Sequence, residues 1–374
     1  MNLTIIETMI RQIEFEITTK CNARCPQCVR NYYGSYTWPT LPIKDIDIRC
    51  LKKSIHPNIW KNLEHIKFCG TYGDPCMNKK FLDILKWVKS VSDAPITIYT
   101  NGGMRSKKWW AELAGILNDK DKVFFGIDGL EDTNHLHRIG VIWKKLIENV
   151  KTFNLAGGTS IWSFLIFKHN EHQVLTAERL SREIGCKDFI VKTTSRFIDK
   201  QHKAIDHTTV YTLDGTVSHI IEPTEVSEYI NQGYSDHEKI INFYGSYKKY
   251  LDKTSIDCGA KKMHNVYVSA EGDVFPCGWL ADRLYGYETE KHSDHIKLLN
   301  MITQVTRESI NLHYTKIEDI VQGKWFARIE ESWKTNELER CAHICGEKST
   351  LIRNANKGVS ETCSGPDREI WATA

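Results

Sequence analysis

The residues of this chain best suited to chemistry are three closely spaced cysteines, Cys21, Cys25 and Cys28, in the pattern C-x3-C-x2-C. Thiolates favour zinc or iron–sulfur clusters over hard cations. A cluster of four irons takes four thiolate ligands, so three cysteines from one loop would leave one iron open to a reactant. A structural zinc loop is the alternative, and it would need a fourth ligand nearby. The spacing thus predicts a centre of soft ligands, with an open position if that centre is a cluster.

A second set of cysteines lies in the C-terminal part of the chain: Cys258, Cys277, Cys341, Cys345 and Cys363. The stretch 266–277 predicts a β-hairpin that turns at Glu271-Gly272. The hairpin would place Cys258 before one arm and Cys277 at the end of the other, and a helical knuckle would add Cys341 and Cys345. Four thiolates suit a second iron–sulfur cluster, and they also suit structural zinc.

The elements that must position these cysteines alternate regularly. Apolar patterning predicts strands at 12–18, 64–69, 95–100, 122–128, 161–167 and 188–192, and helices at 45–55, 79–89, 106–118, 141–156 and 171–184. Strands that alternate with helices of this length indicate parallel βαβ units. The first cysteines follow the first strand directly, at the end where β/α barrels keep their active sites.

Composition excludes several classes. The 374 residues carry a formal net charge of +3, from 50 basic and 47 acidic side chains, which gives no electrostatic footprint for nucleic acid. The N-terminal residues lack the pattern of a signal peptide, and no apolar run is long enough to span a bilayer. We expect a cytoplasmic protein, because thiols stay free to bind metal in that reducing compartment.

The cysteine triplet, set after a first strand, resembles the signature of the radical S-adenosylmethionine (radical SAM) enzymes. That resemblance implies an α/β fold: a partial (β/α)6 TIM-like barrel as the radical SAM core at 1–195. A connecting or cap segment at 196–257 and a small C-terminal α+β domain at 258–374 would follow. The family usually carries an aromatic residue just before the third cysteine, where this chain has Gln27.

The resemblance also implies binding residues for S-adenosylmethionine. The turn 69–75 resembles the glycine–glycine–glutamate turn of the family, so Gly73 and Asp74 would hold the methionyl ammonium; an acid facing a cation is a charge-assisted hydrogen bond. Asn101 and Asp128 would lie at the barrel mouth, where the family often has a ribose-binding serine at the position of Gly126. Arg138 would pair with the methionyl carboxylate.

The C-terminal cysteines resemble the auxiliary-cluster domains called SPASM and twitch. The full SPASM pattern has seven cysteines for two clusters, whereas five are present here, so the resemblance implies one auxiliary 4Fe–4S cluster. Its ligands would be Cys258, Cys277, Cys341 and Cys345. Cys363 is left over, as a substitute ligand, a hydrogen donor or a bystander.

The implied reaction begins when a reductase such as flavodoxin or ferredoxin reduces the first cluster, which cleaves S-adenosylmethionine to a 5′-deoxyadenosyl radical. The radical takes hydrogen from an unknown small-molecule or peptide substrate, and the auxiliary cluster accepts an electron, so the net reaction is an oxidation. Three alternatives stay open: a redox-neutral epimerase or isomerase, a peptide-modifying maturase of the RiPP type, and a non-catalytic electron carrier or zinc-stapled binding protein. The last has no need of a methionine-binding turn at Gly73-Asp74.

Overall fold

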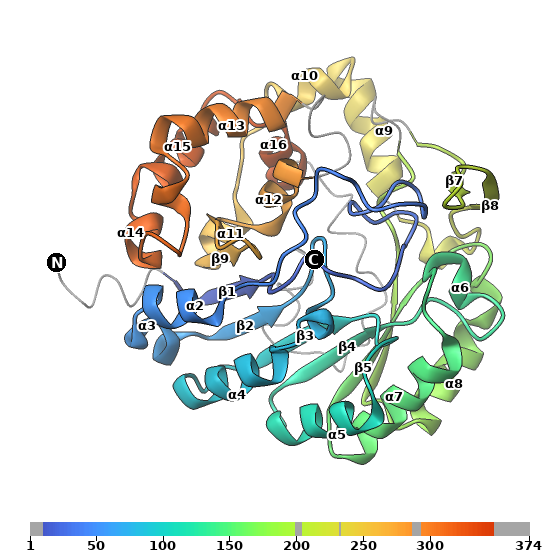
Figure 1. The fold of residues 1–374 in the computed structure, drawn as a ribbon. Coiled ribbons are helices and arrows are strands. Elements are labelled where there is room, and N and C mark those ends of the chain that lie inside the picture. The colour runs from blue at the N-terminus through green and yellow to red at the C-terminus, as the bar shows by residue number, and fades with distance from the viewer. Residues whose placement is uncertain (1–9, 199–203, 232, 286–292, 348–374) are drawn as a thin grey trace.

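An eight-stranded sheet forms the centre of the computed structural model, which describes residues 10–198, 204–231, 233–285 and 293–347. The strand order is β10-β9-β1-β2-β3-β4-β5-β6 (Figure 1). The first six strands along the chain are β1 (Gln12–Phe15), β2 (His65–Phe68), β3 (Ile96–Thr100), β4 (Lys122–Gly126), β5 (Ser160–Leu165) and β6 (Asp188–Lys192).

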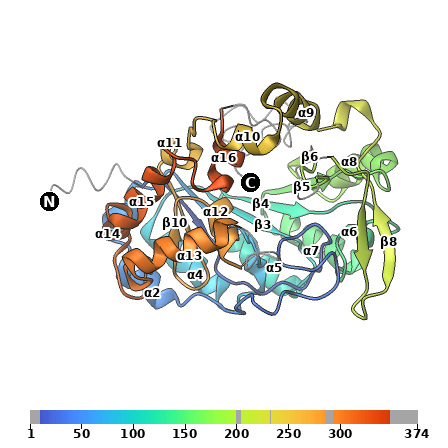
Figure 2. The ribbon, with the colours of Figure 1, turned by 90° about the horizontal axis from the view of Figure 1, so that it is seen from above.

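Strands β1 to β6 pair in parallel, each with the next strand along the chain. The helices that connect them are α2 (Ile48–Ser54), α3 (Pro57–Asn62), α4 (Phe81–Val91), α5 (Lys107–Ile116), α7 (Trp143–Leu155) and α8 (Val174–Glu183), with the short α6 (Asn134–His137), η1 (Pro75–Met77) and η2 (Glu171–Gln173). The helices lie along the outside of the curved sheet (Figures 1 and 2). The sequence prediction of a partial β/α barrel is confirmed, and the sheet stays open, with β6 and β10 as its edges.

The strands are buried on both faces, polar residues included. All four residues of β2 are buried, as are five of the six residues of β5. The buried polar side chains of β2 are paired: Lys67 Nζ lies 3.2 Å from Glu14 Oε2, and His65 Nε2 lies 2.8 Å from the Thr97 hydroxyl. Phe15 stacks on Phe68 at 5.7 Å and on Trp60 at 5.8 Å, which joins β1 to β2 and α3. The same core continues without a break to Trp325.

The C-terminal hairpin extends the barrel sheet. Strand β9 (Asn265–Val268) pairs in parallel with β1, and β10 (Val274–Phe275) returns antiparallel to β9. Gly272 supplies the turn with φ = +89°, where a side chain would be strained. The predicted hairpin is therefore confirmed. Its pairing was not predicted: it covers the edge of β1, which would otherwise expose unpaired N–H and C=O groups.

The remaining elements lie around the sheet. The segment 196–257 holds the hairpin β7 (Thr208–Tyr211) and β8 (Val217–Ile221), then η3 (Ser227–Tyr229), α9 (Gly233–Tyr244) and α10 (Tyr247–Leu251). The C-terminal helices are α11 (Gly259–Lys262), α12 (Gly278–Tyr285), α13 (Ser293–Val305), η4 (Glu308–Ile310), α14 (Ile317–Val321), α15 (Lys324–Ser332) and α16 (Glu339–Cys345). In the part of the chain described, none of the helices is long and apolar enough to cross a membrane.

Candidate active site

The first cysteine set lies on the loop that follows β1, over the ends of the parallel strands (Figure 1). Cys21, Cys25 and Cys28 are all half-buried, and all three line one cavity of about 380 Å³. Thr18 and Thr19 fix the start of the loop, since their hydroxyls donate to Asp45 Oδ1 and to the carbonyl of residue 42, each at 2.6 Å. The structure thus brings the three predicted ligands to one side of one cavity.

Two polar side chains approach the thiols of this loop. Asn101 Nδ2 lies 3.7 Å from Cys21 Sγ, and Arg138 Nη1 lies 3.9 Å from Cys25 Sγ. Burial, and then the Asp74 carboxylate, raise the pKa of the Cys21 thiol above its ordinary value. Burial raises the pKa of Cys25 to about 11, although Arg138 opposes that shift. A bound cation would reverse the effect, because a coordinating thiol is deprotonated outright.

The turn after β2 packs closely against the start of the cysteine loop. A Cβ on Gly73 would lie 1.9 Å from the carbonyl oxygen of Thr18, and a Cβ on Gly70 would lie 1.5 Å from the carbonyl oxygen of Gly73. Neither position can therefore carry a side chain without a shift of backbone. Gly73 therefore allows the turn to pack directly against the main chain of the cysteine loop.

Asp74 is buried and faces the same cavity. Its carboxylate accepts from the Thr100 hydroxyl at 2.9 and 3.0 Å, from the Asn101 backbone N–H at 2.7 Å and from the Cys76 N–H at 3.0 Å. Burial raises the pKa of Asp74, and these hydrogen bonds oppose the shift. The carboxylate thus joins the turn after β2 to the end of β3, a positioning role that the sequence did not indicate.

Asn101, Asp128 and Arg138 hold different places at the barrel mouth. The Asn101 side chain donates to Asn22 Oδ1 at 2.9 Å, within the cysteine loop. Asp128 is fully buried behind the cavity wall, with Oδ2 2.6 Å from Arg138 Nε and 2.7 Å from His137 Nδ1. Burial raises the pKa of Asp128, but Arg138 and His137 outweigh it and hold the value at about 2. Asp128 does not line the cavity, whereas Arg138 and Asn101 do.

Glu16 is a site residue that the sequence reading missed. Its Oε1 accepts the backbone N–H groups of Tyr72 at 2.6 Å and of Gly73 at 3.0 Å, and the Tyr267 hydroxyl donates to Oε2. Burial raises the pKa of Glu16 from 4.5 to about 7. Glu16 thus connects the turn after β2 to strand β9. An acid placed directly after a buried barrel strand is the signal that could have found it.

Gln27 and Lys192 complete the wall. Gln27 Oε1 accepts from the Thr194 hydroxyl at 3.0 Å and its Nε2 donates to Thr208 at 3.3 Å, so this residue joins the cysteine loop to the chain beyond β6. Lys192, also missed, lies 5.6 Å over the Tyr99 ring and lines the cavity. Burial, followed by nearby cations, lowers the pKa of Lys192 to about 8.

The second cysteine set gathers at the base of the C-terminal helices. Cys258 and Cys277 bracket the hairpin, and Cys341 and Cys345 lie one turn apart on α16, as predicted. A hydrogen bond with the Cys345 thiol, and then burial, raise the pKa of Cys258 well above its ordinary value. Burial, with Cys345 nearby, raises the pKa of Cys277 to about 12. Cys258 and Cys345 are therefore neighbours, with Cys277 nearby.

Among the described residues, no group of three or more His, Cys, Asp or Glu, the two cysteine sets included, is placed to hold a single metal ion. Cys363 and His202 lie outside the described residues. Cys69 donates from Sγ to Glu14 Oε1 at 2.6 Å, and Cys50 and Cys76 are buried in the core.

Comparison with known proteins identifies the first part of the chain. Residues 15–180 match the family model described as the Radical SAM superfamily. The chain carries a radical SAM domain. The match begins in β1 and ends in α8, so it includes the cysteine loop, the turn at Gly73-Asp74, and both Asn101 and Arg138.

One curated relative and several solved structures are also similar to this chain. The chain is 24% identical to a tungsten-containing aldehyde ferredoxin oxidoreductase cofactor-modifying protein from Pyrococcus furiosus, over 283 residues that make up 72% of this chain and 71% of that protein. Among solved structures, anSMEcpe with bound AdoMet has 13% identity and a TM-score of 0.50, covering 92% of this chain and 90% of that one. At that identity the likeness shows the fold alone.

A further solved structure is Streptococcus suis SuiB. Bound to S-adenosylmethionine, it has 14% identity and a TM-score of 0.45, covering 72% of this chain; the present chain spans about three fifths, 61%, of it. Bound to precursor peptide SuiA, it has 13% identity and a TM-score of 0.49, covering 89% of this chain and 71% of that one.

The residues of the radical SAM domain fit the groups that this family implies, a 4Fe–4S cluster and S-adenosylmethionine. Three thiols from one loop face the cavity and leave room for a fourth, non-protein ligand. The tight glycine turn, Asn101 and Arg138 supply backbone and polar groups around that space. The donor set and the cavity therefore agree with a cluster that keeps one iron open.

Proposed function

We propose that this chain is a radical SAM enzyme that removes hydrogen from a small-molecule or peptide substrate and oxidises it. The observation that carries the proposal is the composition of one cavity wall. Cys21, Cys25 and Cys28 line it from the N-terminal loop, and Trp279 lines it from α12, the helix that follows Cys277 directly. The helix next to Cys277 therefore borders the same space as the first cysteine set.

When bound, the first cluster would supply the electron that cleaves S-adenosylmethionine to a 5′-deoxyadenosyl radical, and a second cluster would supply an acceptor for an electron from the oxidised substrate. Cys21, Cys25 and Cys28 would hold the first cluster, and Cys258, Cys277, Cys341 and Cys345 would hold the second. A flavodoxin or ferredoxin in the reducing cytoplasm would be the electron donor.

The other side chains of the cavity would bind S-adenosylmethionine and orient the residues that hold it. Arg138 lines the cavity, and its planar guanidinium suits the methionyl carboxylate. The turn at Gly73-Asp74 would receive the methionyl ammonium, through main-chain oxygen and through the Asp74 carboxylate. Asn101 would keep the cysteine loop in place through Asn22, while Asp128 would orient Arg138 from behind.

Two links favour an oxidation over a redox-neutral reaction. The Tyr72 hydroxyl donates to the carbonyl oxygen of Asp282 at 2.8 Å, which joins the turn after β2 to α12. Glu16 joins the same turn to β9. These links hold α12 and strand β9 against the turn at Gly73-Asp74, which supports a role for the second cysteine set in the reaction.

The test uses the full chain, reconstituted with iron and sulfide without oxygen. We expect about eight irons per chain and formation of 5′-deoxyadenosine after reduction. The triple variant Cys21→Ala, Cys25→Ala and Cys28→Ala should keep about four irons and lose all S-adenosylmethionine cleavage. Cys186→Ala, at a thiol outside both sets, is the matched control. Cleavage by the triple variant would contradict the proposal.

The type of reaction is settled with the substrate in deuterated water. An oxidase gives a product two hydrogens lighter and without solvent deuterium. An epimerase gives a product of unchanged hydrogen count that carries one deuterium, delivered by an exchangeable donor such as the Cys363 thiol. Deuterium in the product, lost in Cys363→Ala, would replace the oxidase with the epimerase.

A further inference from the structure

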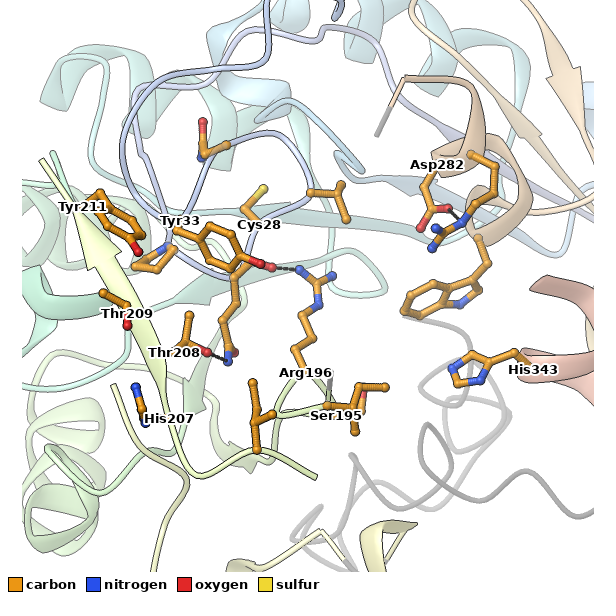
Figure 3. Close-up of a pocket in the computed structure, with 18 of the residues that line it drawn as sticks. Cys28, Tyr33, Ser195, Arg196, His207, Thr208, Thr209, Tyr211, Asp282 and His343 are labelled. Carbon is orange, nitrogen blue, oxygen red and sulfur yellow. Dashed lines mark hydrogen bonds and ion pairs between the residues drawn. The ribbon is translucent and has the colours of Figure 1, made fainter. Parts of the chain in front are cut away.

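A second cavity, of about 560 Å³, opens beside the first. The two share Gln27, Cys28, Ser195, Arg196 and Trp279 as lining residues, so they form one continuous space. Figure 3 shows Cys28 and Arg196 on one side of it and Asp282 and His343 facing them from the C-terminal helices. A molecule in this second cavity would reach the open side of the cysteine loop.

The charges that line the second cavity are unbalanced. Arg196, Arg283 and Arg340 line it, and Asp282 is the single carboxylate among the described residues of the lining. One carboxylate cannot neutralise three guanidinium groups, and guanidinium is charged at all physiological pH values. The described lining therefore carries an excess of two positive charges, before its histidines are considered.

Asp282 does not satisfy all the N–H groups of the arginines beside it. Asp282 Oδ2 accepts from Arg340 Nη2 at 2.7 Å, and Arg340 Nε donates to the carbonyl oxygen of Trp279 at 3.1 Å. Asp282 Oδ1 lies 2.8 Å from Arg283 Nε, but the N–H is not aligned with it, so both atoms are buried without a hydrogen bond. Buried donors in that condition need another acceptor.

These arginines lie on rigid supports between the two cysteine sets. Arg283 is on α12, which starts after Cys277, and Arg340 precedes Cys341 on α16. The Arg340 guanidinium stacks on the Trp279 ring, with 4.8 Å between its carbon and the ring centroid. A stacked and hydrogen-bonded guanidinium is already oriented, so less freedom is lost when it binds an oxyanion.

We propose that the substrate carries an anionic group, a carboxylate or a phosphate, that Arg283 and Arg340 bind in this second cavity. Two oxygens of a planar carboxylate or of a tetrahedral phosphate can accept the paired N–H groups that a guanidinium donates. The anion would fix the substrate between the first cysteine loop and α12, with its reacting carbon toward Cys28. The identification of the bound anion as part of the substrate rests on the proposed function. The existence of the anion site does not depend on it.

The site is tested by direct binding, without S-adenosylmethionine or reductant. Inorganic phosphate and malonate are titrated in turn into the reconstituted full chain at constant ionic strength, and calorimetry measures the affinity. We expect at least one of the two anions to bind the wild type. Phosphate binding alone would identify a phosphorylated substrate, and malonate binding alone would identify a carboxylic acid.

Three variants make the test specific. Arg283→Gln and Arg340→Gln should each bind the anion about tenfold more weakly, because each loses a charge-assisted hydrogen bond. Asp282→Asn should bind it about threefold more tightly, since the competing carboxylate is gone. A merely structural role for Asp282 would weaken binding. Arg283→Lys, which keeps the charge and loses the fork, should fall between wild type and Arg283→Gln.

The control is Arg328→Gln, because Arg328 on α15 is buried to the same degree as Arg283, with side chains 24% and 22% exposed, and pairs with Glu337 away from the cavity. It should keep wild-type affinity. The proposal fails if neither anion binds the wild type, or if the arginine variants bind as the control does. If the wild-type chain does not cleave S-adenosylmethionine, the proposed function is wrong, but the anion-binding result still stands.

Discussion

The guanidinium of Arg138 lies directly against the backbone of Gly126: a Cβ at that glycine would lie 2.4 Å from Nη2. Asp128 and Cys25 border the same guanidinium, with 2.6 Å from Asp128 Oδ2 to Nε and 3.9 Å from Cys25 Sγ to Nη1. The family resemblance leads us to expect a serine at the glycine position. In this chain the arginine side chain fills the space that such a serine would need.

We therefore predict that Gly126→Ser moves Arg138 away from Cys25 and weakens S-adenosylmethionine binding about tenfold, through the lost contact with the methionyl carboxylate. Equilibrium binding to the reconstituted chain measures the effect. Gly115→Ser is the control, since no atom lies within 4 Å of a Cβ there. Unchanged or tighter binding in Gly126→Ser would show that Arg138 does not hold the cofactor.

The observed role of Asp74 in the turn and its proposed role as a cofactor ligand can be separated through Thr100. Thr100→Val removes the hydroxyl that donates to both carboxylate oxygens and keeps the charge. We expect it to lower the free energy of unfolding by about 1 kcal/mol, with little effect on S-adenosylmethionine affinity. Asp74→Asn removes the charge as well, and should weaken cofactor binding about tenfold or more. Equal affinities in the two variants would reduce Asp74 to a purely structural residue.

The buried carboxyl group of Glu16 makes the free energy of unfolding depend on pH. Its pKa of about 7 in the folded chain exceeds the ordinary value of 4.5, mainly because of burial. The native state therefore holds the proton more tightly than the unfolded state, so this contribution to stability is complete below pH 4.5 and is lost as pH rises through 7. The loss is of the order of 3 kcal/mol.

The measurement is the difference in free energy of unfolding between wild type and Glu16→Gln, in urea from pH 5.5 to 8.5. The uncharged amide resembles the protonated acid, so wild type should lose stability relative to this variant across that range. Glu64→Gln is the control, at an exposed carboxylate that pairs with Arg11. A carboxylic acid band in the infrared spectrum that titrates near pH 7 in wild type and is absent from Glu16→Gln would locate the proton at Glu16. If the difference in free energy of unfolding does not change with pH, Glu16 does not titrate in this range and the prediction is wrong.

Local patterns were enough to predict strands β1 to β6, the main helices between them, the β9–β10 hairpin and the two cysteine sets, whereas β7, β8 and most of the later helices were not predicted. The alternation of apolar residues depends only on neighbours in sequence, and the thiol spacing belongs to one loop and one helix. The pairing of β9 with β1 was not predictable in that way, because Phe15 pairs with Val268, 253 positions later in the chain. Glu16, Lys192 and Arg340 were missed for the same reason: their environment is made by distant segments.

Asp128 illustrates a finer limit of sequence reading. Its position after β4 placed it correctly at the barrel mouth, but the direction of its carboxylate depends on His137 and Arg138, which arrive from the following loop. The residue was thus predicted as a ligand group and is observed as a partner of Arg138. Sequence alone indicates which end of the sheet a residue occupies; the packing of neighbouring side chains decides what it faces.

The last prediction concerns the double variant Cys277→Ala and Cys341→Ala, which removes one thiol directly before α12 and one thiol on α16. If the C-terminal set holds a four-iron cluster, iron should fall from about eight to about four per chain. 5′-Deoxyadenosine should still form, but it should no longer be accompanied by product two hydrogens lighter, because the electron acceptor is lost. Metal analysis and mass spectrometry of the products measure both effects. Cys186→Ala should leave both values at the wild-type level. If the wild-type chain contains zinc, and the double variant loses that zinc but no iron, the C-terminal set is a structural zinc site. The oxidation would then need another electron acceptor.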